Sequence, residues 1–61
     1  MSEAHRKILN WCRKSRLGYV MRELRDGTLV VTNCQRSSEP EYSGKTWEEV
    51  AEKLVAAGYD L

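Results

Sequence analysis

Three side chains in this chain could supply a nucleophile or a general base: the single histidine, His5, and the two cysteines, Cys12 and Cys34. Nucleophilic catalysis needs the nucleophile, a base beside it and a group that orients the base. Cys12 falls on an apolar helical stripe, where a free cysteine usually packs as a small hydrophobic residue. Cys34 lies at the end of an expected strand, where a thiol can be exposed and reactive. Since no spacing pairs either thiol with His5, we expect a protein that is not an enzyme.

The sequence also offers few residues that could hold a metal or a cofactor. A structural zinc site normally has four Cys or His ligands at short spacings, whereas positions 5, 12 and 34 offer three ligands and no Cys-x-x-Cys pair. The glycines are isolated at positions 18, 27, 44 and 58, so the chain has no glycine-rich phosphate loop. A zinc site would have to be shared between two subunits. We expect neither a metal nor a cofactor.

The adjacent carboxylates also have a structural explanation. Acid–base catalysis needs a carboxyl group whose pKa is shifted inside a cleft. Glu48 and Glu49 instead fall in the first turn of an expected helix, where the helix dipole favours acidic side chains. A chain this short buries only about 60% of its unfolded surface, which leaves little room for a closed active-site pocket.

Charge divides the chain into two parts, and this division is the best indication of how the protein meets a partner. Residues 1–36 contain eight Lys or Arg and three Asp or Glu, a net charge of +5. Residues 37–61 contain two Lys and six Asp or Glu, a net charge of −4. Opposite charges on separate surfaces favour binding to larger charged molecules, so we expect non-catalytic macromolecular binding.

Residues 3–15 have helical periodicity, with Ser2 as the expected N-cap and Ala4, Ile8 and Trp11 on one apolar stripe. The opposite side of this helix and the segment after it carry a basic set, which consists of Arg6, Lys7, Asn10, Arg13, Lys14 and Arg16. Lys and Arg contact phosphates, and Arg and Asn are common base readers. One hypothesis is therefore a nucleic-acid-binding accessory protein. The alternatives are a solvated helix face, or a basic helix neutralised by an acidic neighbour in the same fold.

Residues 17–24 and 29–34 predict the two strands of a hairpin. Asp26-Gly27 stands between two runs of β-prone residues, and Gly takes the positive φ that the turn requires. Residues 35–45, which contain Pro40, three Ser and Gly44, form the one loop-like stretch. Within this stretch, Tyr42 either belongs to a short third strand or fixes the loop.

A second helix begins after Thr46, whose hydroxyl can accept from the Glu49 amide while Glu49 reaches back in a capping box. Gly58 is placed to end this helix in a left-handed cap, and Tyr59 can fold back onto the last turn. The stretch Gly44-Lys-Thr-Trp-Glu-Glu-Val50 resembles the strand-to-helix junction of HicB-type antitoxins, where Gly-x-Thr-x-Glu-Glu opens a helix. The resemblance covers seven residues that all have capping explanations, and the chain lacks that family's other features. It therefore implies a junction and carries no function.

The second helix and the loop before it carry an acidic set, which consists of Glu39, Glu41, Glu48, Glu49 and Glu52. An acidic face on a small domain can dock on a basic groove of another protein, including a groove that otherwise holds nucleic acid. We rank this function first: a small adaptor or inhibitor that acts on a protein partner. The structural alternative is a solvated helix surface.

These elements predict one domain, residues 1–61, of the α+β class: a small α-β-β-α domain in which an antiparallel hairpin is flanked by two amphipathic helices. A two-stranded sheet is marginal alone and its edges are open to pairing. We therefore expect a homodimer that joins hairpins into one sheet or packs helices across a two-fold axis. The alternative is a monomer whose loop supplies a third strand.

No apolar stretch follows the first seven residues, and the apolar runs are far shorter than the roughly 18 residues of a membrane helix. We therefore expect a cytoplasmic protein with reduced cysteines and no membrane partner. Small stand-alone chains of this kind often come from phages or mobile elements, which is an expectation from size alone.

Overall fold

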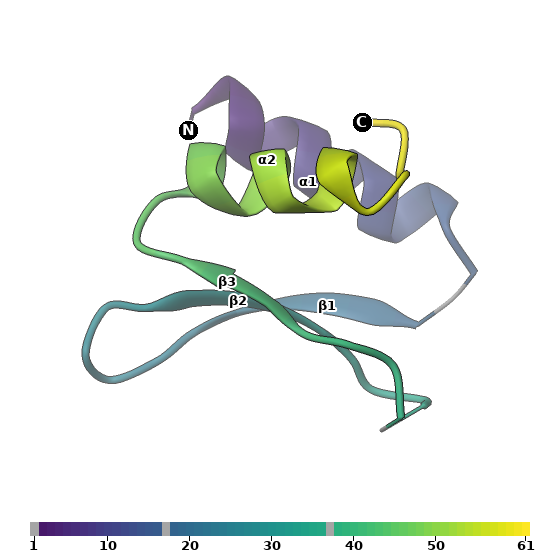
Figure 1. Ribbon diagram of the computed structural model, residues 1–61, viewed down its shortest axis with the longest axis horizontal. Helices are drawn as coiled ribbons and strands as arrows, with labels where there is room; N and C mark the ends of the chain where they lie inside the picture. Colours follow the sequence, from purple (N-terminus) through teal and green to yellow (C-terminus); the bar gives the residue numbers. More distant parts are fainter. Residues whose placement is uncertain (1, 17, 37) are drawn as a thin grey trace.

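Two helices lie on one face of a three-stranded antiparallel sheet in the computed structural model, which describes residues 2–16, 18–36 and 38–61 (Figure 1). The elements in chain order are α1 (Glu3–Lys14), β1 (Tyr19–Glu23), β2 (Leu29–Asn33), β3 (Tyr42–Gly44) and α2 (Trp47–Ala56). The predicted α+β class is confirmed, with one strand added, so that the order is α-β-β-β-α. The two helices of this described part fall short of the length and apolar content that crossing a bilayer requires.

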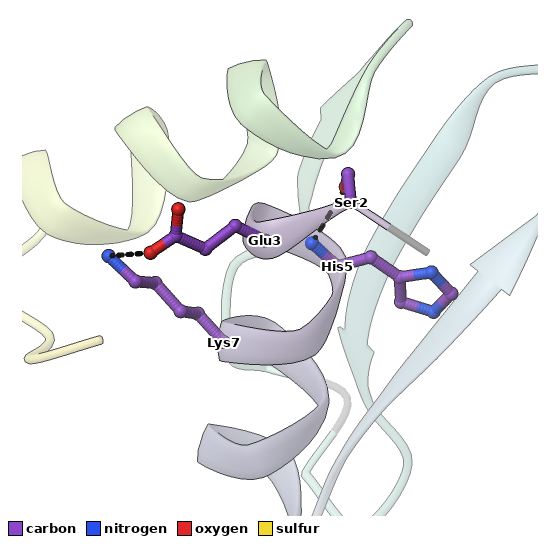
Figure 2. Close-up of polar contacts among 4 residues, drawn as sticks. All are labelled: Ser2, Glu3, His5 and Lys7. Atoms are coloured by element: carbon purple, nitrogen blue, oxygen red, sulfur yellow. Dashed lines mark hydrogen bonds and ion pairs between the residues drawn. The ribbon is translucent and has the colours of Figure 1, made fainter.

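Helix α1 begins at the predicted cap. The Ser2 hydroxyl accepts a hydrogen bond from the His5 amide at 3.1 Å (Figure 2). This bond satisfies one of the amide groups that the first turn of any helix leaves without a helical partner. The helix ends at Lys14, one residue before the predicted end, and the Ser15 amide donates to the Trp11 carbonyl at 2.8 Å.

The hairpin forms where Asp26-Gly27 predicts it. β1 pairs with β2 in antiparallel register, with Met21 opposite Val31. Gly27 has a φ of +90° and supplies the left-handed conformation of the turn. The Thr28 amide donates to the Asp26 carboxylate at 2.9 Å, which lowers the pKa of Asp26. Position 17, the first of the predicted strand, lies outside the described residues.

The stretch 35–45, predicted as a loop, contains the third strand. Tyr42 pairs with Val31 of β2, and Ser43 pairs with Val30. Three residues are too few for the alternation of a strand to show in a sequence, which is why Tyr42 was the one indication of a strand in this stretch. The loop supplies a strand as in the monomeric alternative, while the homodimer stays a prediction.

Helix α2 begins at the predicted capping box. The Thr46 hydroxyl accepts from the Glu49 amide at 3.2 Å, and the Glu49 carboxylate accepts from the Lys45 amide at 3.2 Å. The returned hydrogen bond therefore comes from the residue before the N-cap and not from the N-cap itself. These contacts make Gly44–Val50 a strand end joined directly to a helix start.

The end of α2 is a Schellman motif. Gly58 has a φ of +99°, and its amide donates to the Val55 carbonyl at 3.0 Å. The Tyr59 amide donates to the Leu54 carbonyl at 3.1 Å. A residue with a Cβ is strained at this φ, so Gly suits the position. The predicted left-handed cap is confirmed, and it turns Tyr59 back over the last turn of α2.

One cluster of buried side chains joins the helix layer to the sheet. Its members are Ile8 from α1, Tyr19, Leu29 and Val31 from the sheet, and Val50 and Leu54 from α2. Cys12 packs against this cluster, as its place on the apolar stripe predicts, and burial raises the pKa of its thiol. These side chains hold the inner sides of α1 and α2 against the sheet, so the opposite side of each helix faces away from the sheet.

Candidate functional site

The basic set predicted from the sequence lies where a partner can reach it. All of its members are exposed, and all but Arg16 belong to α1. Because a helix advances about 100° per residue, Arg6 and Arg13 lie on one flank of its outer side and Lys7 and Lys14 on the other. The structure therefore gathers the five members that belong to α1 on one helix surface, which we call the basic surface of α1.

Lys7 also lines a groove between the two helices, which lie side by side and begin at the same end of the sheet (Figure 1). Across this groove from Lys7 stand Ala51 and Glu52 of α2. Within the described residues the one ion pair joins Lys7 to Glu3 of the same helix, at 3.6 Å (Figure 2). Such an exposed pair contributes little stability. The basic helix is therefore next to the acidic helix without being paired to it.

The acidic set is dispersed. Glu48 and Glu52 are exposed on α2, whereas the Glu49 carboxylate is bound within the cap of that helix. Glu41 accepts a hydrogen bond from the Thr32 hydroxyl of β2 at 3.4 Å. Glu39 is half-buried and lines a pocket at the end of the molecule where both helices finish. The five carboxylates therefore do not form one continuous face, and docking on a protein partner stays a prediction.

The candidate catalytic residues have separate surroundings. His5 stacks on Trp47 where the helices begin, with ring centroids 5.2 Å apart. Cys34 is exposed after β2, and its thiol donates to the Gly18 carbonyl at 3.1 Å. In the described part of the chain, no three or more His, Cys, Asp and Glu side chains are grouped to hold a metal ion. The expectation that the protein is not an enzyme stays a prediction.

A pocket of about 230 Å³ opens at the end of the molecule where α1 and α2 finish. This pocket is more enclosed than the groove between the helices. Its lining consists of Arg16, Tyr19, Asn33, Gln35, Arg36, Glu39 and Tyr59. The sequence analysis singled out Arg16 and Glu39 for different surfaces and did not predict that they share a pocket.

Local hydrogen bonds hold one wall of the pocket. Asn33 is only 7% exposed, and its side-chain oxygen accepts from the amides of Gln35 and Arg36, both at 2.9 Å. This Asx turn directs the chain after β2 and places Arg36 at the pocket. Arg16 reaches the pocket because it directly follows Ser15, the C-cap of α1.

Two phenol groups meet at the pocket. The hydroxyls of Tyr19 and Tyr59 are 3.4 Å apart, and Tyr19 is only 4% exposed. The hydrogen bond with Tyr59, together with burial, raises the pKa of Tyr19 to about 12. Tyr42 packs edge-on against Tyr59 with ring centroids 6.1 Å apart, and burial raises the pKa of Tyr42 as well. Tyr19 and Tyr42 therefore stay protonated at neutral pH and can donate hydrogen bonds.

Two local signals in the sequence point toward parts of this pocket. An Asn at the end of a strand often bonds the backbone two residues on, which would have indicated the turn at Asn33. Gly58 indicates that Tyr59 turns back over α2. Neither signal shows that the two features meet, because they belong to distant segments of the chain.

Comparisons with protein-family models, with curated proteins and with solved structures gave no match to this chain. The resemblance at Gly44–Val50 is accounted for by the strand-to-helix junction and its capping hydrogen bonds. The surfaces of the molecule are thus the basis for a functional proposal.

Proposed function

We propose that this protein binds nucleic acid through the basic surface of α1, with Arg6, Asn10 and Arg13 as central contacts. The observation that carries the proposal is the gathering of exposed cations on one helix surface. The acidic set, by contrast, is divided among a helix cap, a helix surface, a strand contact and a pocket. Phosphates fit such a basic surface because Lys and Arg supply most of the attraction to a nucleic-acid backbone.

The spacing of the cations supports contact with several phosphates at once. Arg6 and Arg13 are two helical turns apart, or about 10 Å along the helix axis at 1.5 Å per residue. Lys7 and Lys14 repeat the same spacing on the other flank of α1. Asn10 lies between the four cations, where its amide can donate to a phosphate oxygen.

A duplex fits this surface better than a single strand. Single-strand binding relies on aromatic faces on which bases stack. The aromatic rings here pack on one another instead: Trp47 stacks on His5, and Trp11 contacts Tyr19 and Tyr59. The proposed mode is therefore contact with the phosphate backbone of double-stranded nucleic acid, with little dependence on base sequence.

Fluorescence anisotropy with a labelled duplex at several salt concentrations tests the proposal. Four phosphate contacts predict a slope of about −3.6 in log affinity against log salt. That slope corresponds to a loss of roughly 100-fold in affinity between about 50 and 200 mM salt. The double variant Arg6→Gln/Arg13→Gln should reduce the steepness of the slope by about 2.

The matched control is Arg22→Gln/Arg25→Gln, which removes the same charge from β1 and the hairpin turn, where both residues are exposed. This control should leave the slope nearly unchanged. Equal losses in both double variants would show a response to net charge alone and would overturn the assignment to α1. A protein that shows no salt-dependent affinity for duplex or single strands would end the proposal.

A further inference from the structure

The pocket at the end of α1 contains polar groups that backbone binding along the helix does not use. We infer that this pocket binds a phosphomonoester, namely the terminal phosphate of a strand whose backbone lies along the basic surface of α1. The inference rests on the proposed function. The volume of about 230 Å³ accommodates a phosphate group, and Arg16 and Arg36 are among the residues that line it.

The lining has the chemistry that a phosphomonoester needs. A phosphomonoester carries about −1.5 to −2 charges at pH 7 and three acceptor oxygens. Each guanidinium offers a planar fork of N–H donors that matches two of those oxygens. The hydroxyls of Tyr19 and Tyr59 need one hydrogen for the bond between them, so a second O–H can turn toward a phosphate oxygen.

The shape of the pocket favours a terminal phosphate over an internal one. An internal phosphodiester continues into the chain on two sides and needs an open groove, whereas a terminal phosphate continues on one side only. The pocket is more enclosed than the groove between the helices. Two of its lining residues, Tyr19 and Asn33, are 4% and 7% exposed, so buried side chains close its base.

The pocket also lies where a strand on α1 would end. Arg13 is exposed in the last turn of the helix, and Arg16 comes three positions later in the pocket lining. The two arginines thus connect the basic surface of α1 to the pocket without an intervening acidic residue in the sequence. A backbone bound along the helix would therefore contact Arg13 and then Arg16, at the pocket that Arg36 also lines.

The negative charge of Glu39 allows the inference to be tested by whether its removal strengthens or weakens phosphate binding. Its half-buried carboxylate shares the pocket with Arg16 and Arg36, which leaves the charged lining residues with a net charge of +1. A bound phosphate dianion would be repelled by this carboxylate. Replacing Glu39 with Gln should therefore tighten the binding of a terminal phosphate, whereas a purely structural role predicts no gain.

The experiment compares one duplex carrying a 5′-phosphate, a 3′-phosphate or hydroxyl groups at both ends, with anisotropy at fixed salt. A duplex that is one base pair longer and has hydroxyl ends controls for added charge. We expect a terminal phosphate at one of the two ends to increase affinity about tenfold, the gain expected from a charge-assisted contact. Arg16→Gln/Arg36→Gln should abolish this preference, and Glu39→Gln should enlarge it several-fold.

The outcomes separate the inference from the function on which it rests. Salt-dependent binding with equal affinity for phosphate and hydroxyl ends would overturn the pocket and leave the surface of α1 supported. A preference that survives Arg16→Gln/Arg36→Gln in a folded variant would overturn the pocket as well. If only the phosphorylated duplex bound, and Arg16→Gln/Arg36→Gln abolished that binding, the pocket would be supported and the proposed surface of α1 would be rejected.

Discussion

Where both helices begin, polar side chains bond to backbone close by: Ser2 and Thr46 cap the two helices, and Glu49 accepts from a neighbouring amide. Where both helices finish, Arg16 and Arg36 instead line a pocket. We call these two regions the capping end and the pocket end. The polar side chains named at the capping end are bonded within the fold, whereas the two arginines at the pocket end are available to a ligand.

The comparison indicates how stability and binding are divided in a chain this short. Each bond at the capping end spans three or four positions, as from residue 46 to residue 49. The pocket end is assembled from segments after α1, after β2 and after α2. Changes at the capping end should therefore cost stability without affecting the ligand. Changes at the pocket end should affect the ligand whether or not they cost stability.

The largest effect is expected from Gly58→Ala, compared with Gly27→Ala. The two glycines have φ values of +99° and +90°, and an added Cβ would meet no atom within 4 Å at either position. Both substitutions should therefore lower the free energy of unfolding by about 1–2 kcal/mol through backbone strain alone. For a domain of this size, each kcal/mol corresponds to a fall in Tm of about 4–8 °C.

Only Gly58→Ala should also weaken the preference for a terminal phosphate, because Gly58 turns Tyr59 back toward the pocket. Gly27 lies in the hairpin turn, at the same end of the sheet as the start of α2 (Figure 1). Thermal unfolding followed by circular dichroism measures the first effect, and anisotropy measures the second. An equal loss of preference in both variants would show that the two ends are not independent.

The capping end could be predicted from the sequence because its interactions are local. The caps at Ser2 and Thr46 follow from residue types a few positions apart, and so does the equally local left-handed cap at Gly58, although it lies at the pocket end. Helical periodicity likewise placed the basic residues on one side of α1. It could not place the acidic ones together, since Glu39 and Glu41 lie in no helix and their positions depend on where the loop runs.

The third strand was predicted only as an alternative and the pocket was not predicted, because each depends on contacts between distant segments. β3 exists through pairing of Tyr42 with Val31, and the Lys53 side chain of α2 donates to the Ser43 carbonyl of the same strand. No pattern within 35–45 specifies either contact. The pocket depends in the same way on the meeting of Tyr19 with Tyr59, which are 40 positions apart in the sequence.

A smaller effect is expected from Thr46→Ala at the capping end. The substitution removes the hydroxyl that accepts from the Glu49 amide, and a lost N-cap costs about 1 kcal/mol. Chemical denaturation should show this loss, while the preference for a terminal phosphate stays unchanged. Thr46→Ser keeps the cap hydroxyl and serves as the control with nearly full stability. A change in phosphate preference in Thr46→Ala would contradict the division between the ends.

The smallest effect at neutral pH is expected from Tyr19→Phe, which removes one long hydrogen bond worth about 0.5 kcal/mol. Its consequence is larger in alkali. Tyr19 titrates at about 12 in the folded protein against an ordinary pKa of 10.0, so between these values the unfolded chain releases a proton that the folded protein keeps. The stability that this shift contributes is complete below pH 10 and is lost as the pH rises through 12.

Unfolding measured across this alkaline range should therefore show a shallower decline in Tyr19→Phe than in the unsubstituted protein. Tyr42→Phe is the matched control, because it also removes a phenol whose pKa burial raises, yet Tyr42 does not line the pocket. Both variants should flatten the alkaline decline, but only Tyr19→Phe should also reduce the preference for a terminal phosphate. An equal reduction in both would mean that the preference does not depend specifically on the Tyr19 hydroxyl, which would contradict its placement in the pocket.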